Sequence, residues 1–218
     1  MIPQVFHAIW IQGVRERPSG DYLYTFLEHH PGWNLQIWDE NSFKSRLWMC
    51  MDQKLRDLYD SLPHVVQKAD VARIIILYHF GGIYVDLDFA CLQPLELRYV
   101  QSSFFAVVEH DGIICNGIFG SVPKHPMLKV VLDEWRDHGI PPFITDKKQW
   151  ILNSTGPHRI STLWRQHANK SGIVIEDDIQ KFFPFSQAET RMYKDHNIEQ
   201  ISKMFPNALA CHMYWGQW

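Results

Sequence analysis

Two aspartates stand two residues apart in the segment Tyr84-Val85-Asp86-Leu87-Asp88. Hard divalent ions such as Mg²⁺ and Mn²⁺ take carboxylate oxygens from proteins, and they often complete their coordination with substrate phosphates and water. The run Ile83–Phe89 is predicted to be a strand, in which residues two apart point to the same face. The two carboxylates therefore predict a metal site that binds a diphosphate, although two aspartates at a strand end are common.

A helix is expected directly before this strand. Between His64 and Phe80 the apolar residues recur at helical spacing, and Gly81-Gly82 is a typical helix stop. Asp70 and Arg73 are three residues apart in this helix and so share one face. Taken alone, they would be an ordinary ion pair worth about 0.2–0.5 kcal/mol.

The other expected elements alternate between strand and helix in the first half of the chain, and strands cluster later. Strands are predicted over 2–11, 33–38, 104–109, 113–121, 173–175 and 208–212, helices over 126–138 and 157–169, and a helix-compatible stretch over 42–62. The dipeptide Asp111-Gly112 is a strong hairpin signal. This order predicts one α/β domain over residues 1–218, with a central mixed β-sheet flanked by helices.

Composition narrows the class of protein. A chain of 218 residues can bury a core without disulfides, and a net charge of −3 without a run of Lys or Arg argues against nucleic acid as the main partner. The four scattered cysteines predict reduced thiols and no zinc site. The longest apolar run is too short to span a bilayer, so we expect no transmembrane segment and a cytoplasmic protein, at most peripheral to a membrane.

The helix and the acidic strand together form an ordered pattern, Ala69-Asp70-x-x-Arg73-x-x-x-Leu77-x-x-x-Gly81-Gly82-Ile83-Tyr84-x-Asp86-x-Asp88. This pattern resembles the sugar-binding region of the Asp-x-Asp glycosyltransferases, which include yeast initiating mannosyltransferases, capsular polysaccharide glycosyltransferases and the glucosyltransferase domain of large clostridial toxins. Further matches lie at Ile2–Trp10, Trp33–Asp39, Asn116-x-Ile118 with His125-Pro126, Gly156-Pro157 and His212–Trp218. The resemblance therefore runs from end to end of the chain.

The resemblance implies a GT-A type fold, a nucleotide-sugar donor with UDP favoured over GDP, Mn²⁺ or Mg²⁺, and transfer of a hexose with retention of the anomeric configuration. The acceptor would be a glycan, a lipid-linked sugar or a protein. Because retaining enzymes of this kind lack a nucleophile at glycosidase spacing, a phosphate oxygen of the leaving group is the expected proton acceptor, and no catalytic base is nominated.

Roles carry over by position. Asp88 would be the metal ligand, completed by His212, and Asp86 and Asn116 would join Asp88 at the reacting centre. The donor would be bound by residues that match the family's pattern: Trp10 beside the nucleobase, Tyr84 and Asp86 on the nucleoside and sugar, Asp70 and Arg73 on sugar hydroxyls, and Trp218 on the diphosphate. The sequence departs from the pattern at Gln217, where many relatives have Ser, which puts the contribution of the tail in doubt.

Two other functions fit part of the pattern. A phosphohydrolase of the haloacid-dehalogenase type also places Asp-x-Asp at a strand end, and Glu176-Asp177-Asp178 could supply its late acidic ligands. That class usually has Gly or Thr after the second Asp, near the N-terminus, whereas Phe89-Ala90 follows here in mid-chain. A non-catalytic module that binds a nucleotide-sugar is the second alternative, and Gln217 is the only hint of it.

Overall fold

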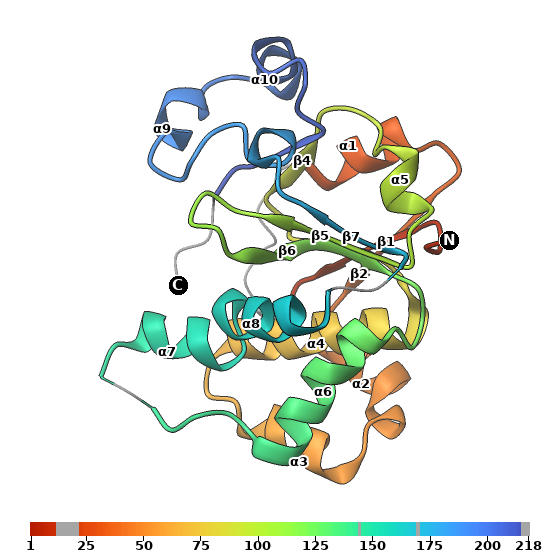
Figure 1. The fold of residues 1–218 in the computed structure, drawn as a ribbon, viewed down its shortest axis with the longest axis vertical. Coiled ribbons are helices and arrows are strands. Elements are labelled where there is room, and N and C mark those ends of the chain that lie inside the picture. The colour runs from red at the N-terminus through yellow and green to blue at the C-terminus, as the bar shows by residue number, and fades with distance from the viewer. Residues whose placement is uncertain (12–21, 144, 169–170, 215–218) are drawn as a thin grey trace.

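A six-stranded mixed sheet forms the centre of the computed structural model, which describes residues 1–11, 22–143, 145–168 and 171–214 (Figure 1). The strand order is β2-β1-β3-β6-β5-β7. The strands are β1 (Val5–Ile9), β2 (Asn34–Trp38), β3 (Gly82–Val85), β5 (Phe104–Val108), β6 (Ile114–Ser121) and β7 (Ile173–Glu176). Strand β1 is parallel to β2 and β3, β6 is antiparallel to β3 and β5, and β7 is parallel to β5. The predicted mixed sheet is confirmed.

Helices cover both faces of this sheet. Figure 1 shows α4, α6 and α8 on one face and α1 and α5 on the other. The α-helices are α1 (Tyr22–His29), α2 (Glu40–Leu47), α3 (Gln53–Ser61), α4 (Val65–Phe80), α5 (Leu97–Val100), α6 (Pro126–His138), α7 (Lys147–Ser154), α8 (Pro157–His167), α9 (Thr190–Tyr193) and α10 (Ile198–Met204). Short 3-10 helices span Trp48–Cys50 and Ile179–Lys181. None of the helices in the described part of the chain is long and apolar enough to cross a membrane.

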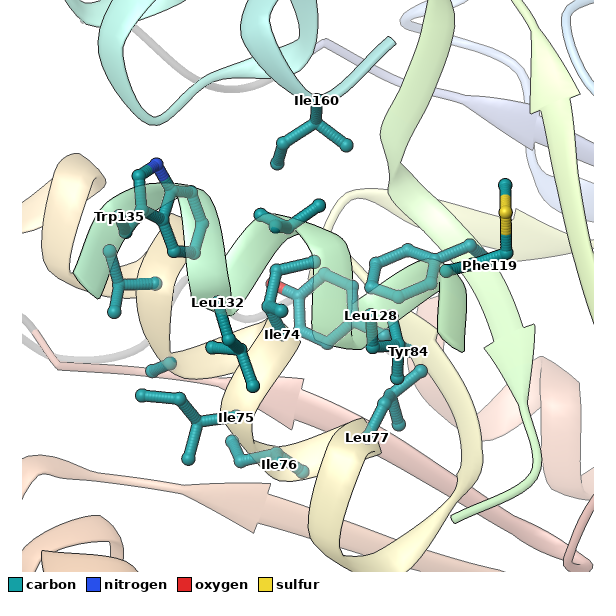
Figure 2. Close-up of a cluster of buried hydrophobic side chains, with 14 of the residues drawn as sticks. Ile74, Ile75, Ile76, Leu77, Tyr84, Phe119, Leu128, Leu132, Trp135 and Ile160 are labelled. Carbon is teal, nitrogen blue, oxygen red and sulfur yellow. The ribbon is translucent and has the colours of Figure 1, made fainter. Parts of the chain in front are cut away.

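Helix α4 is the central helix of the core. Its residues Ile74–Leu77 are buried against side chains of α6, α8 and the sheet (Figure 2). The labelled partners there are Tyr84, Phe119, Leu128, Leu132, Trp135 and Ile160. The helix ends at Gly81, whose φ of +64° is unfavourable for any residue with a Cβ, and the chain then enters β3 directly. The predicted helix and its glycine stop are confirmed, and α4 thereby holds Asp70 and Arg73 against β3.

The predicted strand Ile83–Phe89 is wrong in its second half. Strand β3 ends at Val85, and residues 86–88 form a turn in which the Phe89 N–H donates to the Asp86 carbonyl oxygen at 3.1 Å. The chain then enters β4 (Phe89–Cys91), which pairs with β8 (Ala210–His212) in a separate antiparallel sheet. Because the chain leaves the central sheet here, Asp86 and Asp88 do not share one face of a strand.

Other boundaries also differ from the prediction. The stretch 42–62 is not one helix but α2 and α3, separated by the 3-10 turn at Trp48–Cys50 and by Asp52, whose carboxylate caps α3 by accepting from the Leu55 N–H. The hairpin at Asp111-Gly112 is confirmed: the Glu109 N–H donates to the Ile113 oxygen at 2.8 Å, and Gly112 has a φ of +79°. All four cysteines are free.

His7 on β1 joins three elements. Its Nε2 is 3.1 Å from the Gly81 carbonyl oxygen, to which it donates, and its Nδ1 accepts from the Trp38 indole N–H at 3.0 Å. Only the neutral ring satisfies both partners, because a protonated Nδ1 cannot accept. Burial lowers the pKa of His7 to about 4.

This histidine makes stability dependent on pH. Its unfolded form takes a proton near pH 6.5, where the folded form does not, so the free energy of unfolding should fall as pH drops from 6.5 toward 4, by up to about 3 kcal/mol. His7→Gln can donate and accept but cannot titrate, and we expect a shallower pH dependence in this variant. Urea unfolding at pH 7.5, 6 and 5 measures both slopes; identical slopes would contradict this role for His7.

Candidate functional site

The turn at residues 86–88 is fixed from two sides. On one side the Asp86 N–H donates to the Gly117 oxygen on β6 at 2.7 Å. On the other, pairing of β4 with β8 brings His212 beside Asp88: its Nε2 is 3.1 Å from Asp88 Oδ1. The Met213 N–H donates to the Asp88 carbonyl oxygen at 2.8 Å. Segments far apart in sequence thus meet at the carboxyl end of β3, the end of a strand at which open α/β sheets bind ligands.

Arg73 lies beneath this turn and links its surroundings. Its Nη1 donates to the Asn116 backbone carbonyl oxygen at 2.8 Å and is 3.2 Å from Asp86 Oδ1, and its Nη2 is 3.2 Å from Asp70 Oδ1. The guanidinium also lies over the Tyr84 ring, 4.6 Å from its centroid. The buried Arg73 guanidinium therefore pairs with two carboxylates, those of Asp70 and Asp86.

The two carboxylates are held by further donors. Asp70 accepts from the Asn116 side-chain amide on Oδ1 at 2.9 Å and from the Thr155 hydroxyl on Oδ2 at 3.0 Å. Asp86 accepts from the Tyr84 hydroxyl at 2.6 Å. We call the set Asp70, Arg73, Tyr84, Asp86, Asn116 and Thr155 the buried network. Each member comes from an element that the core fixes in place, so the orientation of the Asp86 carboxylate is set before any ligand binds.

Burial governs the electrostatics of this network. It raises the pKa of Asp70 to about 7, although Arg73, Thr155 and Asn116 act in the opposite direction. Burial likewise raises the pKa of Asp86; Arg73 lowers it and the Asp88 carboxylate raises it further. With two carboxylates sharing one guanidinium, and a third close by, the site has an excess of negative charge that a cation would relieve.

Asp88 and His212 are the residues that would hold such a cation. Burial alone would lower the pKa of His212, but Asp88 and the neighbouring acidic groups raise it overall. The ring stacks on Phe89 with centroids 4.4 Å apart, which fixes its orientation, and its Nδ1 is buried without a hydrogen-bond partner in the described part of the chain. A carboxylate oxygen and an imidazole nitrogen suit Mn²⁺, whereas Mg²⁺ prefers oxygen alone.

The protein side of this candidate cation site is sparse. Within the described residues there is no group of three or more His, Cys, Asp or Glu that could hold a metal ion. Asp88 and His212 would suit an ion that takes most of its coordination shell from phosphate and water.

Exposure separates the predicted site residues into two groups. The side chains of Asp86, Asp88 and His212 are 30%, 14% and 16% exposed. Those of Asp70 and Arg73, at 2% and 4%, lie behind them. A ligand would therefore meet the turn and β8 first.

Of the residues predicted to bind the nucleobase and the diphosphate, the structure describes only some. Trp10 directly follows β1, which is parallel to β3, so it lies at the same edge of the sheet as the turn. Its backbone N–H donates to the Trp38 backbone oxygen at 2.7 Å. Trp218 and Gln217 lie outside the described residues. The structure brings Asp70, Arg73, Tyr84, Asp86 and Asn116 into one network and Asp88 with His212 into an adjacent pair.

Sequence reasoning missed the role of Gly117. A Cβ on this residue would lie 2.7 Å from Asp86 Oδ2, so the carboxylate occupies the space that a side chain would need. A glycine within a strand is the signal that indicates such a close approach.

Gly117→Ala should displace the Asp86 carboxylate. We expect any activity that uses this carboxylate to fall about tenfold to hundredfold, because small misplacements of a binding group cost that much, whereas the protein should still fold. Steady-state kinetics and thermal unfolding together test this. Wild-type turnover in the alanine variant would show that the position of Asp86 is not critical.

Part of the chain matches a known protein family, and the chain is similar in sequence to several curated proteins. Residues 19–105 match the model of the glycosyltransferase sugar-binding region containing the DXD motif. The inositol phosphoceramide mannosyltransferase 2 of Schizosaccharomyces pombe is 28% identical over 77% of this chain and 47% of its own length. The mannosyl phosphorylinositol ceramide synthase CSH1 of Saccharomyces cerevisiae is 27% identical over 90% of this chain and 50% of its own. The chain thus spans about half the length of these curated relatives.

A solved structure has the same architecture. The UDP-bound glycosyltransferase domain from the YGT toxin superposes with a TM-score of 0.59, covering 94% of this chain and 89% of its own, at 10% sequence identity. At that identity the likeness concerns the fold alone. The predicted GT-A fold, with its mixed sheet flanked by helices, is confirmed.

Proposed function

We propose that this chain transfers a hexose from a nucleotide-sugar to a hydroxyl group, because residues 19–105 match the model of the glycosyltransferase sugar-binding region that contains the DXD motif. One observation carries the proposal: the Asp88–His212 pair and the Asp86 carboxylate, backed by Arg73, converge at the carboxyl end of β3. UDP is favoured as the nucleotide because a neighbour of the same fold binds it, and GDP is the alternative.

Asp88 and His212 would hold Mn²⁺ or Mg²⁺ beside the donor diphosphate. A bound cation would offset the negative charge that develops on the departing diphosphate, which favours the transition state over the ground state. His212 is oriented for this by its stacking on Phe89, and Asp88 by the Met213 N–H on its backbone.

The buried network would serve the sugar. The Asp86 carboxylate is exposed enough to accept from a sugar or ribose hydroxyl, and Arg73 and Tyr84 fix its direction. Asp70 and Arg73 lie behind this carboxylate and would act on the sugar through it. The Asn116 side-chain amide donates to Asp70, and the Asn116 backbone oxygen accepts from Arg73. Preorganised groups of this kind cost no reorganisation during reaction.

The proton of the acceptor would leave on a phosphate oxygen of the departing nucleotide, with retention of the anomeric configuration. The acceptor would be a glycan, a lipid-linked sugar or a protein. The curated relatives are named for transfer to an inositol phosphoceramide, which supports a polar group on a lipid as one acceptor class.

The phosphohydrolase alternative loses one of its three late acidic ligands, Glu176, because other contacts already occupy that carboxylate. Glu176 is 4% exposed, and its carboxylate accepts from the Tyr99 hydroxyl, from Arg98 and from the Asp178 N–H. These partners tie the end of β7 to α5, so the Glu176 carboxylate has a structural role.

A donor panel separates the remaining functions. The protein would be incubated with UDP- and GDP-sugars and with a phosphomonoester, each with Mn²⁺, Mg²⁺ or chelator, and release of nucleotide and phosphate would be followed. We expect nucleoside diphosphate release from at least one donor only when metal is present. Release of phosphate from the monoester alone would refute the transferase, and donor binding without release would indicate the non-catalytic module.

A further inference from the structure

Helix α4 is tied to the link between α7 and α8 by two side-chain hydrogen bonds. The Thr155 hydroxyl donates to Asp70 Oδ2 at 3.0 Å, and the Gln67 amide donates to the Ser154 hydroxyl oxygen at 3.0 Å. Gln67 and Asp70 are three residues apart and share one face of α4, and all four residues are at most 1% exposed. Among the side-chain hydrogen bonds of the described residues, the one from Thr155 joins this link to the rest of the buried network.

The two oxygens of Asp70 are held in different ways. Oδ1 receives both the Asn116 amide and Arg73, whereas Thr155 is the side-chain donor to Oδ2 among the described residues. Losing the hydroxyl would leave a buried carboxylate oxygen without its donor, and the group would then rotate or take up a proton. Either change would alter the position or the charge of the Asp70 carboxylate that pairs with Arg73.

The Thr155 hydroxyl is not required to end helix α7. The backbone does this: the N–H groups of Thr155 and Gly156 donate to the Ile151 carbonyl oxygen at 3.2 and 3.0 Å. Pro157 then begins α8 at a position where a missing N–H costs nothing. The Thr155 hydroxyl is therefore not needed to end α7 or to begin α8, and it donates to Asp70 instead.

We propose that Thr155 is a positioning residue for the donor sugar, which sets the Asp70 carboxylate and, through Arg73, the Asp86 carboxylate. This inference rests on the proposed transferase function. Its contacts lie on the Asp70 side of the network, away from the Asp88–His212 pair, so loss of the hydroxyl should weaken recognition of the sugar and spare the nucleoside diphosphate.

Three variants isolate this role. Thr155→Val keeps the shape and removes the donor, Thr155→Ser keeps the donor, and Ser154→Ala removes the neighbouring bond to Gln67 without touching Asp70. For each, kcat and KM for the donor sugar and the Kd for the free nucleoside diphosphate would be measured with metal present.

We expect Thr155→Val to lower kcat/KM for the donor about tenfold to hundredfold, as for loss of a hydrogen bond to a charged group, with an unchanged Kd for the nucleoside diphosphate. Thr155→Ser should recover most of this activity, and Ser154→Ala should match wild type. If Thr155→Val does not fold, Thr155→Ala makes the same comparison, since it also lacks the hydroxyl.

Several outcomes would overturn the inference. Wild-type kcat/KM in the variants without a hydroxyl would do so, as would equal losses for sugar and nucleoside diphosphate, or a Ser154→Ala variant as impaired as Thr155→Val. In these cases wild type is active and only the role of Thr155 fails. A wild type that releases no nucleotide from any donor would instead overturn the proposed function and this inference with it.

Discussion

Replacing Asp88 with Asn is expected to reduce metal-dependent turnover by at least about a hundredfold to thousandfold, as for loss of a group that stabilises developing charge. The amide is neutral and a poor ligand for a hard cation. The fold should survive, because the Asp88 backbone oxygen keeps its hydrogen bond from the Met213 N–H, and an Asn oxygen can still accept from His212 Nε2 in place of Asp88 Oδ1. Turnover at saturating Mn²⁺ and thermal unfolding measure the two effects separately.

A matched control is Asp111→Asn in the β5–β6 hairpin turn. Asp111 is exposed, and its Oδ1 accepts from the Ile113 N–H, a role that Asn also fills. We expect wild-type turnover in this variant. Undiminished turnover in Asp88→Asn, or equal loss in the control, would refute the assignment of Asp88 as a ligand.

Arg73→Met should lower the free energy of unfolding by about 3–5 kcal/mol at pH 7, because it leaves the buried Asp70 carboxylate and the partly exposed Asp86 carboxylate without their cation. Asp70 and Asp86 both face the guanidinium at 3.2 Å. Urea unfolding measures the loss. It should shrink at acid pH, since burial raises the pKa of both groups and protonation removes the unpaired charges.

Arg136→Met is the control for this variant. Arg136 also pairs with two carboxylates, those of Asp133 and Asp137, but its side chain is 33% exposed. Pairs of that kind contribute about 0–1 kcal/mol. Similar losses of unfolding free energy in the two variants would show that burial does not increase the contribution of Arg73 to stability.

The parts of the fold that could be predicted depend on local signals. The helical spacing before Gly81-Gly82 predicted α4, and Asp111-Gly112 predicted the β5–β6 hairpin, because each pattern lies within one element or one turn. The end of β3 could not be predicted in this way. Strand-forming residues continue to Phe89. In the structure, however, Phe89 pairs with His212 of β8 in a separate sheet, and a pairing with so distant a strand cannot be predicted from the local sequence.

The candidate site shows the same limit. Spacing in the sequence correctly placed Asp70 and Arg73 on one face of a helix, but it predicted only the small contribution of an ordinary ion pair. Their burial depends on β6 and the α7–α8 link, which the spacing within α4 does not reveal. The sequence carries no signal for the contact that Thr155 makes. Its bond to Asp70 joins residues 85 positions apart, and no local pattern predicts such a contact.

The most direct measurement of the central claim is calorimetric titration of UDP and GDP into the wild-type protein, with Mn²⁺ and with chelator. If the turn at residues 86–88 holds the donor diphosphate through a cation, at least one nucleotide will bind with Mn²⁺, and the binding will be lost with chelator and in Asp88→Asn. Binding that is equally tight in all three conditions, or that is absent for both nucleotides with Mn²⁺, would contradict the claim.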